Sequence, residues 1–62
     1  MKVKDLMLKL YDDQKVNIHD YLFRLKNYFT GIADNIPLDV QELTIEQICI
    51  YNDILILKVS NS

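Results

Sequence analysis

Residues 47–58, QICIYNDILILK, constrain the fold more than any other stretch of this chain. Two apolar runs flank Asn52 and Asp53, and both of these residues tolerate the positive φ angles of a tight two-residue turn. Apolar runs rich in isoleucine on both sides of such a turn are typical of paired strands. The segment therefore predicts a β-hairpin that turns at Asn52 and Asp53 and places Glu46 opposite Val59.

The predicted hairpin is apolar on both faces. The pairing places five core candidates on one face, namely Ile48, Ile50, Leu55, Leu57 and Val59. The opposite face carries Cys49, Tyr51, Ile54 and Ile56. Because a sheet with one helix layer alternates apolar with polar residues, this second face needs a cover of its own. We expect it to be an interface, covered by residues 38–43, by a second copy of the chain or by a different protein.

The length of the chain makes such a cover important. At 62 residues the chain forms one small domain, residues 1–62, and a domain of this size buries only about 60% of the surface that its unfolded form exposes. The single Cys49 cannot close an intramolecular disulfide, and together with His19 it falls short of the four ligands of a structural zinc site. We therefore expect association to supplement the stability, with homodimerisation through the second hairpin.

The first half of the chain predicts a helix and another hairpin. An apolar stripe with helical spacing predicts a helix over residues 3–11, and it consists of Val3, Leu6, Met7 and Leu10. Residues 16–33 predict a hairpin that turns near residues 24–27, with Tyr21, Phe23 and Leu25 on a strand face. Residues 20–29 also fit a helix with Asp20 as its cap, and this alternative stays open. Gly31 predicts a bulge or a close approach of another chain segment.

The remaining segment links the two hairpins. Pro37 follows a turn-forming stretch and leads into a short helix predicted over residues 38–43. Together these elements predict an α+β fold of order α-β-β-short α-β-β, in which the N-terminal helix packs on a small antiparallel sheet.

The residues that resemble catalytic parts are badly placed for catalysis. His19 and Asp20 are neighbours on a predicted strand, so their side chains point to opposite faces. Cys49 lies between isoleucines, where a reactive thiolate is scarce. The sequence contains no glycine-rich phosphate loop and no metal-ligand spacing. We therefore predict a protein that is not an enzyme and that uses no cofactor or metal.

Charge is distributed unevenly along the chain. The net charge is −2, and most of the lysines and arginines precede residue 27. An acidic surface is predicted from Asp34, Asp39, Glu42, Glu46 and Asp53. Because nucleic-acid binders carry a dense positive patch, we do not expect nucleic acid as the partner. No apolar run approaches the roughly 18 residues of a membrane span, and the charged start is unlike a signal peptide, so we expect a cytoplasmic protein without a membrane partner.

Four stretches carry a resemblance to a protein group. They are VKDLMLKL, VNIHDY, FTGIADNIP and ICIYNDILILKV. Their order resembles that of the small α+β accessory proteins of phages and prophages of low-GC Gram-positive bacteria. The resemblance implies stoichiometric binding of a host protein, including inhibition of anti-phage defence enzymes.

Residues and resemblance together predict a non-catalytic protein-binding module, a phage-encoded inhibitor of a host defence protein. Two mechanisms stay open, because the acidic surface could occupy a basic groove on the target and the apolar hairpin face could block an assembly surface. One alternative function is that of a scaffold component of a phage or regulatory assembly. The other is that of a small nucleic-acid-associated regulator.

Overall fold

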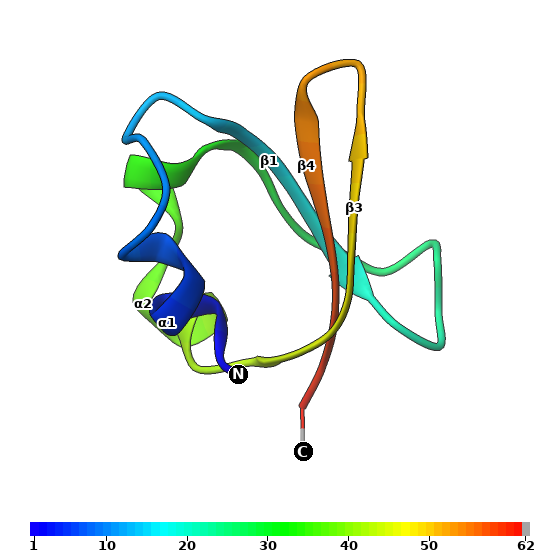
Figure 1. Ribbon diagram of the computed structural model, residues 1–62. Coiled ribbons are helices and arrows are strands. Elements are labelled where there is room, and N and C mark those ends of the chain that lie inside the picture. The colour runs from blue at the N-terminus through cyan, green and yellow to red at the C-terminus, as the bar shows by residue number, and fades with distance from the viewer. Residues whose placement is uncertain (62) are drawn as a thin grey trace.

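A computed structural model describes residues 1–61 and has an α+β architecture, with two short helices on one side of a four-stranded sheet (Figure 1). The elements in chain order are α1 (Val3–Met7), β1 (Lys15–Asp20), β2 (Asn27–Ile32), the 3₁₀ turn η1 (Ala33–Asn35), α2 (Leu38–Gln41), β3 (Thr44–Tyr51) and β4 (Ile54–Ser60). Each predicted hairpin therefore exists, and residues 20–29 do not form the alternative helix.

The sheet is mixed, which corrects the antiparallel sheet expected from the sequence. Its strand order is β2-β1-β4-β3, and β1 pairs in parallel with β4 while the other pairs are antiparallel. The segment through α2 carries the chain across to the far edge, where β3 begins, and β4 then returns between β3 and β1. Local sequence patterns reveal hairpins but not such a long-range pairing, because parallel strands need a long crossover.

The β3–β4 hairpin has the predicted turn and most of the predicted register. Asn52 and Asp53 have φ angles of 52° and 63°, and Tyr51 lies opposite Ile54. The end far from the turn differs, because a bulge between Ile45 and Gln47 places Ile45 rather than Glu46 opposite Val59. The bulge turns the apolar Ile45 toward the core, against which it packs.

The core lies between the helices and one face of the sheet. Its buried members are Val3, Val16, Ile18, Ala33, Ile36, Val40, Leu43, Leu55, Leu57 and Val59. The prediction that Ile48 and Ile50 fill this core is wrong, because they are 46% and 74% exposed. The two helices cover the β1 and β4 strands, whereas the β3–β4 turn extends past them (Figure 1).

Both helices are shorter than predicted. α1 ends at Met7 rather than at residue 11, and the chain continues in tight turns in which Lys9 N–H donates to the Leu6 carbonyl at 2.9 Å. These turns bring Leu10 back against the core. α2 ends at Gln41 rather than at residue 43. The short helices leave part of the core face open.

Gly31 is neither a bulge nor a point of close approach by another chain segment, because the side chain that packs on it is that of Phe29 in the same strand. A Cβ atom at this position would lie 2.9 Å from the Phe29 ring carbon Cζ. The bulge of this hairpin lies at Tyr28, the extra residue of β2 opposite the step from Ile18 to His19. The Phe29 ring therefore packs over the glycine and partly covers β2 on the core face.

Candidate protein-binding surfaces

Residues 21–26, here named the β1–β2 loop, form the most exposed apolar segment of the described chain. The prediction that Tyr21, Phe23 and Leu25 lie on a strand face is wrong, because β1 ends at Asp20 and β2 begins at Asn27. Leu22, Phe23 and Leu25 are 78%, 68% and 100% exposed. A small protein seldom leaves this many large apolar side chains together in water, and such patches mark interaction sites.

The Asp20 carboxylate orders this loop. Its Oδ2 atom accepts hydrogen bonds from the N–H groups of Leu22 at 3.0 Å and Phe23 at 2.9 Å. The hydroxyl of Tyr28 donates to Oδ1 at 3.2 Å. The hydrogen bond from Phe23, with those from Leu22 and Tyr28, holds the pKa of Asp20 below its ordinary value although partial desolvation acts the other way. Asp20 thus holds the backbone of the loop, and the apolar side chains of the loop remain exposed to solvent.

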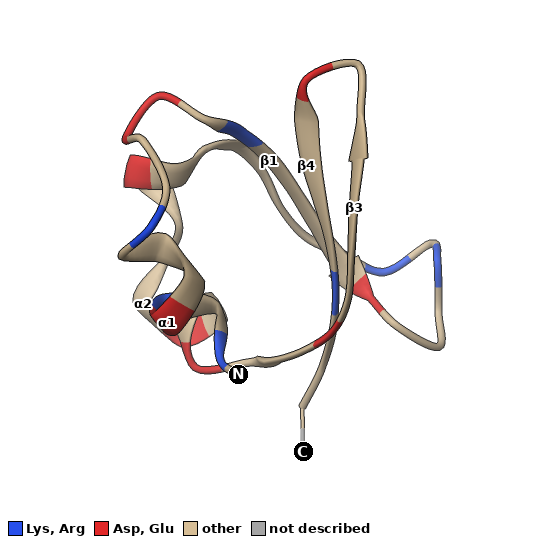
Figure 2. Ribbon diagram, viewed as in Figure 1, with Lys and Arg blue, Asp and Glu red and all other residues tan. Residues whose placement is uncertain are grey.

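The β1–β2 loop is also cationic. Arg24 and Lys26 lie within it, and no acidic residue does, as the right-hand loop of Figure 2 shows. The Lys26 Nζ atom lies 5.1 Å from the centre of the Tyr28 ring, within the range of a cation–π contact. Lys26 N–H donates to the Phe23 carbonyl at 3.0 Å, which tightens the turn. The loop therefore combines apolar anchors with two positive charges.

The outer face of the sheet, which points away from the helices, is the second surface. It carries the four predicted interface residues, of which Cys49, Ile54 and Ile56 are half-buried and Tyr51 is exposed. The register extends this face across β1 and β2 through Lys15 and Ile32. A shallow hollow of about 230 Å³ lies there, and it is lined by Lys15, Val16, Thr30, Gly31, Ile32 and Ile54.

Residues 38–43 do not cover the outer face, which removes one of the three covers considered. Val40 and Leu43 are buried in the core together with Val3, and α2 lies beside α1 on the opposite side of the sheet (Figure 1). The core already needs this segment, because α1 is too short to close it alone. Of the three predicted covers of the outer face, a second copy and another protein stay predictions.

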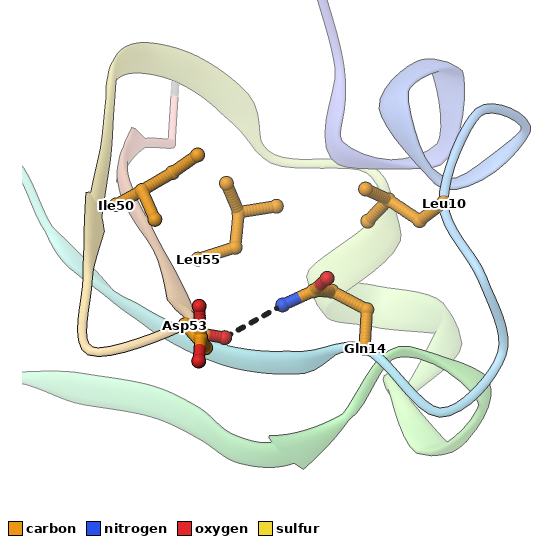
Figure 3. Close-up of a pocket in the computed structure, with 5 residues that line it drawn as sticks. All are labelled: Leu10, Gln14, Ile50, Asp53 and Leu55. Carbon is orange, nitrogen blue, oxygen red and sulfur yellow. Dashed lines mark hydrogen bonds between the residues drawn. The ribbon is translucent and has the colours of Figure 1, made fainter.

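A cavity of about 260 Å³ opens on the core face near the β3–β4 turn. Figure 3 shows its lining by Leu10, Gln14, Ile50, Asp53 and Leu55. Gln14 Nε2 donates to the Asp53 carbonyl at 3.0 Å, which joins the segment before β1 to the tip of the hairpin. Apart from this bond the walls are mainly aliphatic. The cavity therefore offers apolar contact rather than groups for chemistry.

The predicted acidic residues do not form one continuous patch. Asp34 lies in η1, Asp39 in α2, Glu46 in β3 and Asp53 in the β3–β4 turn, so the carboxylates are spread along the molecule (Figure 2). Glu42 lies 3.5 Å from Lys2 Nζ and 3.1 Å from Lys4 Nζ, and its hydrogen bond from Lys4 and the charges of both lysines lower its pKa. Positive and negative charges are therefore mixed beside the helices.

His19, Asp20 and Cys49 do not come together as a reactive group. His19 lies in β1 opposite Lys58 of β4, and Cys49 lies in β3 beyond β4. The Asp20 carboxylate is already occupied by the β1–β2 loop. Within residues 1–61, no three His, Cys, Asp or Glu side chains are grouped closely enough to hold a metal ion.

No protein-family model, curated protein or solved structure matches this chain. Among the described residues, no helix has both the length and the apolar character needed to cross a membrane. The candidate surfaces must therefore be interpreted from their own geometry.

Proposed function

We propose that this protein is a non-catalytic protein-binding module and that the β1–β2 loop makes its principal contact with the target. The observation that carries the proposal is the group of exposed apolar side chains Leu22, Phe23 and Leu25 on a backbone ordered by Asp20. A loop that is ordered before binding loses little conformational entropy on binding. Aromatic and arginine side chains are also the commonest anchors of protein interfaces, and Phe23 and Arg24 are adjacent here.

The chemistry of the loop specifies the kind of target surface. Leu22, Phe23 and Leu25 fit an apolar pocket, and Arg24 and Lys26 fit an acidic rim around that pocket. Following the resemblance to phage accessory proteins, we propose that the target is a host defence protein in the cytoplasm and that the module inhibits it stoichiometrically by blocking an assembly surface. The scattered positions of the predicted acidic residues favour this mechanism over mimicry of nucleic acid.

A scaffold role is the second candidate, and the apolar outer face supports it. Cys49, Tyr51, Ile54 and Ile56 lie on a face that no described helix covers, next to the hollow lined by Ile32 and Ile54. A structural component would use this face in repeated contacts. It would form higher-order assemblies without any target protein, whereas an inhibitor would bind its target in a fixed ratio.

The test is capture of a target by the full chain and by matched surface variants. The double variant Phe23→Ser and Leu25→Ser removes the loop anchors, and Leu38→Ser removes an equally exposed leucine on α2. We expect wild type and Leu38→Ser to recover the same host protein in a fixed molar ratio, and the loop variant to recover at least ten-fold less. Equal recovery by all three proteins would exclude the loop as the binding site.

An infection assay then tests the inhibitory role. Expression of the wild-type protein in a host that carries the target is expected to raise the yield of a phage that this host restricts. The loop variant should fail to do so at equal expression, and Leu38→Ser should act like wild type. A restored phage yield with the loop variant would contradict inhibition through this loop.

A further inference from the structure

We propose that β3 pairs edge to edge with β3 of a second copy of this chain, in an antiparallel arrangement with a two-fold axis at Cys49. The pairing would join two four-stranded sheets into one. This inference does not depend on the β1–β2 loop, because a different part of the molecule carries it.

β3 has an open edge along part of its length. It is the last strand in the order β2-β1-β4-β3. The residues before α1 occupy the first part of this edge, where Lys2 forms a bridge with Thr44 and Ile45 N–H donates to the Met1 carbonyl at 2.8 Å. The stretch of residues 47–51 continues beyond this contact toward the turn. Nothing else in residues 1–61 pairs with the outer side of that stretch.

The backbone of this stretch specifies the chemistry of its partner. In a hairpin with a two-residue turn, the pair that flanks the turn is hydrogen-bonded, and hydrogen-bonded and non-hydrogen-bonded pairs alternate from there. Tyr51 and Cys49 therefore direct their N–H and C=O groups toward β4, and Ile48 and Ile50 direct theirs outward. An alternating row of outward donors and acceptors matches another extended strand.

The open edge lacks the features that usually prevent strand pairing. Residues 47–51 contain no charged residue and no proline, and the bulge of β3 lies before them, between Ile45 and Gln47. Ile48 and Ile50 are also exposed on the core face, where apolar contact is available. The other sheet edge, β2, is partly protected by its own bulge at Tyr28 and by the Phe29 ring over Gly31.

A second copy of β3 fits this edge because the edge is self-complementary. With the axis at Cys49, Ile48 of each copy lies opposite Ile50 of the other, so their outward N–H and C=O groups pair. Gln47 lies opposite Tyr51, and the two Cys49 residues face each other. The isoleucines of both copies share the core face and cover one another beside the cavity that Ile50 lines. The second copy thus contributes Ile48 to the wall of that cavity.

The ends of the paired segment support the same register. With this axis, Asn52 of the second copy lies opposite Glu46. The turn of the second copy therefore begins just before Ile45, where Met1 already occupies the edge. Moving the axis to Ile48 would place the Glu46 carboxylate opposite Ile50, and moving it to Ile50 would leave Ile48 opposite Asn52. The axis at Cys49 gives the best match.

Cys49 supplies a direct test, because it is the chain's one cysteine. Side chains of a directly opposed, non-hydrogen-bonded pair have Cβ atoms about 4.5–5.5 Å apart, close to the separation in a disulfide. Mild copper-catalysed oxidation of the full chain is expected to give a covalent dimer that a thiol reductant reverses. Light scattering over a concentration series, without oxidant, should show the same dimer. A monomer at all concentrations would overturn the proposal.

Matched variants separate edge pairing from other contacts. Ile50→Lys places charge on the open edge at a side chain that is already exposed, so the fold should persist by circular dichroism while the dimer dissociation constant rises at least ten-fold. Leu8→Lys, an exposed site on the helix side, should leave the dimer intact. A dimer that resists Ile50→Lys and does not cross-link at Cys49 would overturn edge pairing. The loop variant Phe23→Ser with Leu25→Ser should dimerise normally, which distinguishes this proposal from the target-binding one.

Discussion

The two hairpins of this molecule keep their order in different ways. The β3–β4 hairpin closes with two residues whose φ angles are positive, and its register follows from the turn. The β1–β2 hairpin closes with a longer loop, in which the Asp20 carboxylate replaces side-chain packing as the organising contact. Apolar residues next to the tight turn are therefore used in strand pairing. Apolar residues in a loop that a carboxylate organises remain available for a partner.

The contrast is sharpest between β4, a core strand of the second hairpin, and the loop that closes the first hairpin. β4 contributes Leu55, Leu57 and Val59, all of which are buried. The β1–β2 loop contributes none of its large apolar side chains to the core. Both hairpins supply the centre of the fold, the first through Val16 and Ile18 of β1, but only the first closes with a loop of exposed apolar side chains.

The largest effect is expected from truncating a leucine in each hairpin. Leu57 is fully buried between β1 and β3, so Leu57→Ala should lower the free energy of unfolding by about 3 kcal/mol through lost burial and a cavity. Leu25→Ala should change it by less than about 0.5 kcal/mol, because Leu25 is fully exposed. Urea denaturation followed by circular dichroism measures both. Similar losses for the two variants would show that the loop packs against the protein.

A smaller effect is expected at the tight turn. Asp53→Val puts a β-branched residue at a φ angle of 63°, which should cost about 1–2 kcal/mol of stability. Asp53→Gly should raise stability by up to about 1 kcal/mol, since Asn-Gly suits this turn better. Thermal unfolding gives the sign of each change. If both variants changed the stability in the same direction, the positive φ angle of residue 53 would not be what determines the stability of this turn.

Loosening the β1–β2 loop should change local order more than global stability. Asp20→Ala removes the acceptor for the N–H groups of Leu22 and Phe23, so hydrogen exchange at these amides should become faster. Amides of β4 should exchange at nearly their original rates. Asp13→Ala, which removes an exposed carboxylate from the turn before β1, serves as the control. Unchanged exchange in Asp20→Ala would show that the backbone alone holds the loop.

The smallest effect is expected from pH. Asp20 and Glu42 both have lowered pKa values in the folded protein, so they stabilise it at pH values above the ordinary carboxylate pKa, near 4. This stabilisation is lost as the pH falls through their folded-state pKa values. We expect the thermal midpoint to decline below about pH 4, and to decline less steeply in Asp20→Asn. High salt should also make the decline less steep, because Glu42 is exposed and Asp20 is only half-buried. A midpoint that rises on acidification would contradict these assignments.

The sequence was most informative where local chemistry decides the structure. Asn52 and Asp53 suit a two-residue turn, and the pairs on both faces near that turn follow from it. The register failed only at the Ile45 bulge, because burial of the isoleucine outweighs regular pairing. The α+β composition was likewise predictable from the helical stripe and the β-forming runs.

Other features depend on contacts that no local pattern contains. The alternation of Tyr21, Phe23 and Leu25 is typical of a strand, yet the role of Asp20 as acceptor for two loop N–H groups removes these residues from the sheet. The sequence did contain a local indication of this role, because an aspartate before an apolar run often accepts hydrogen bonds from the N–H groups that follow it. The exposure of Ile48 and Ile50 could not be read from the sequence, because it depends on where α1 stops and on which strand becomes the edge.

The parallel pairing of β1 with β4 has a kinetic consequence. Val16 and Leu55 are neighbours in the sheet although roughly 40 residues separate them in the chain. Each hairpin can form from local contacts within microseconds. A two-stranded hairpin is only marginally stable alone, so neither hairpin should persist until β1 pairs with β4. Pairing of β1 with β4 closes a long loop of chain, which costs conformational entropy, so this step should set the folding rate. Before β1 and β4 have paired, the apolar β3–β4 hairpin is the segment most prone to aggregate.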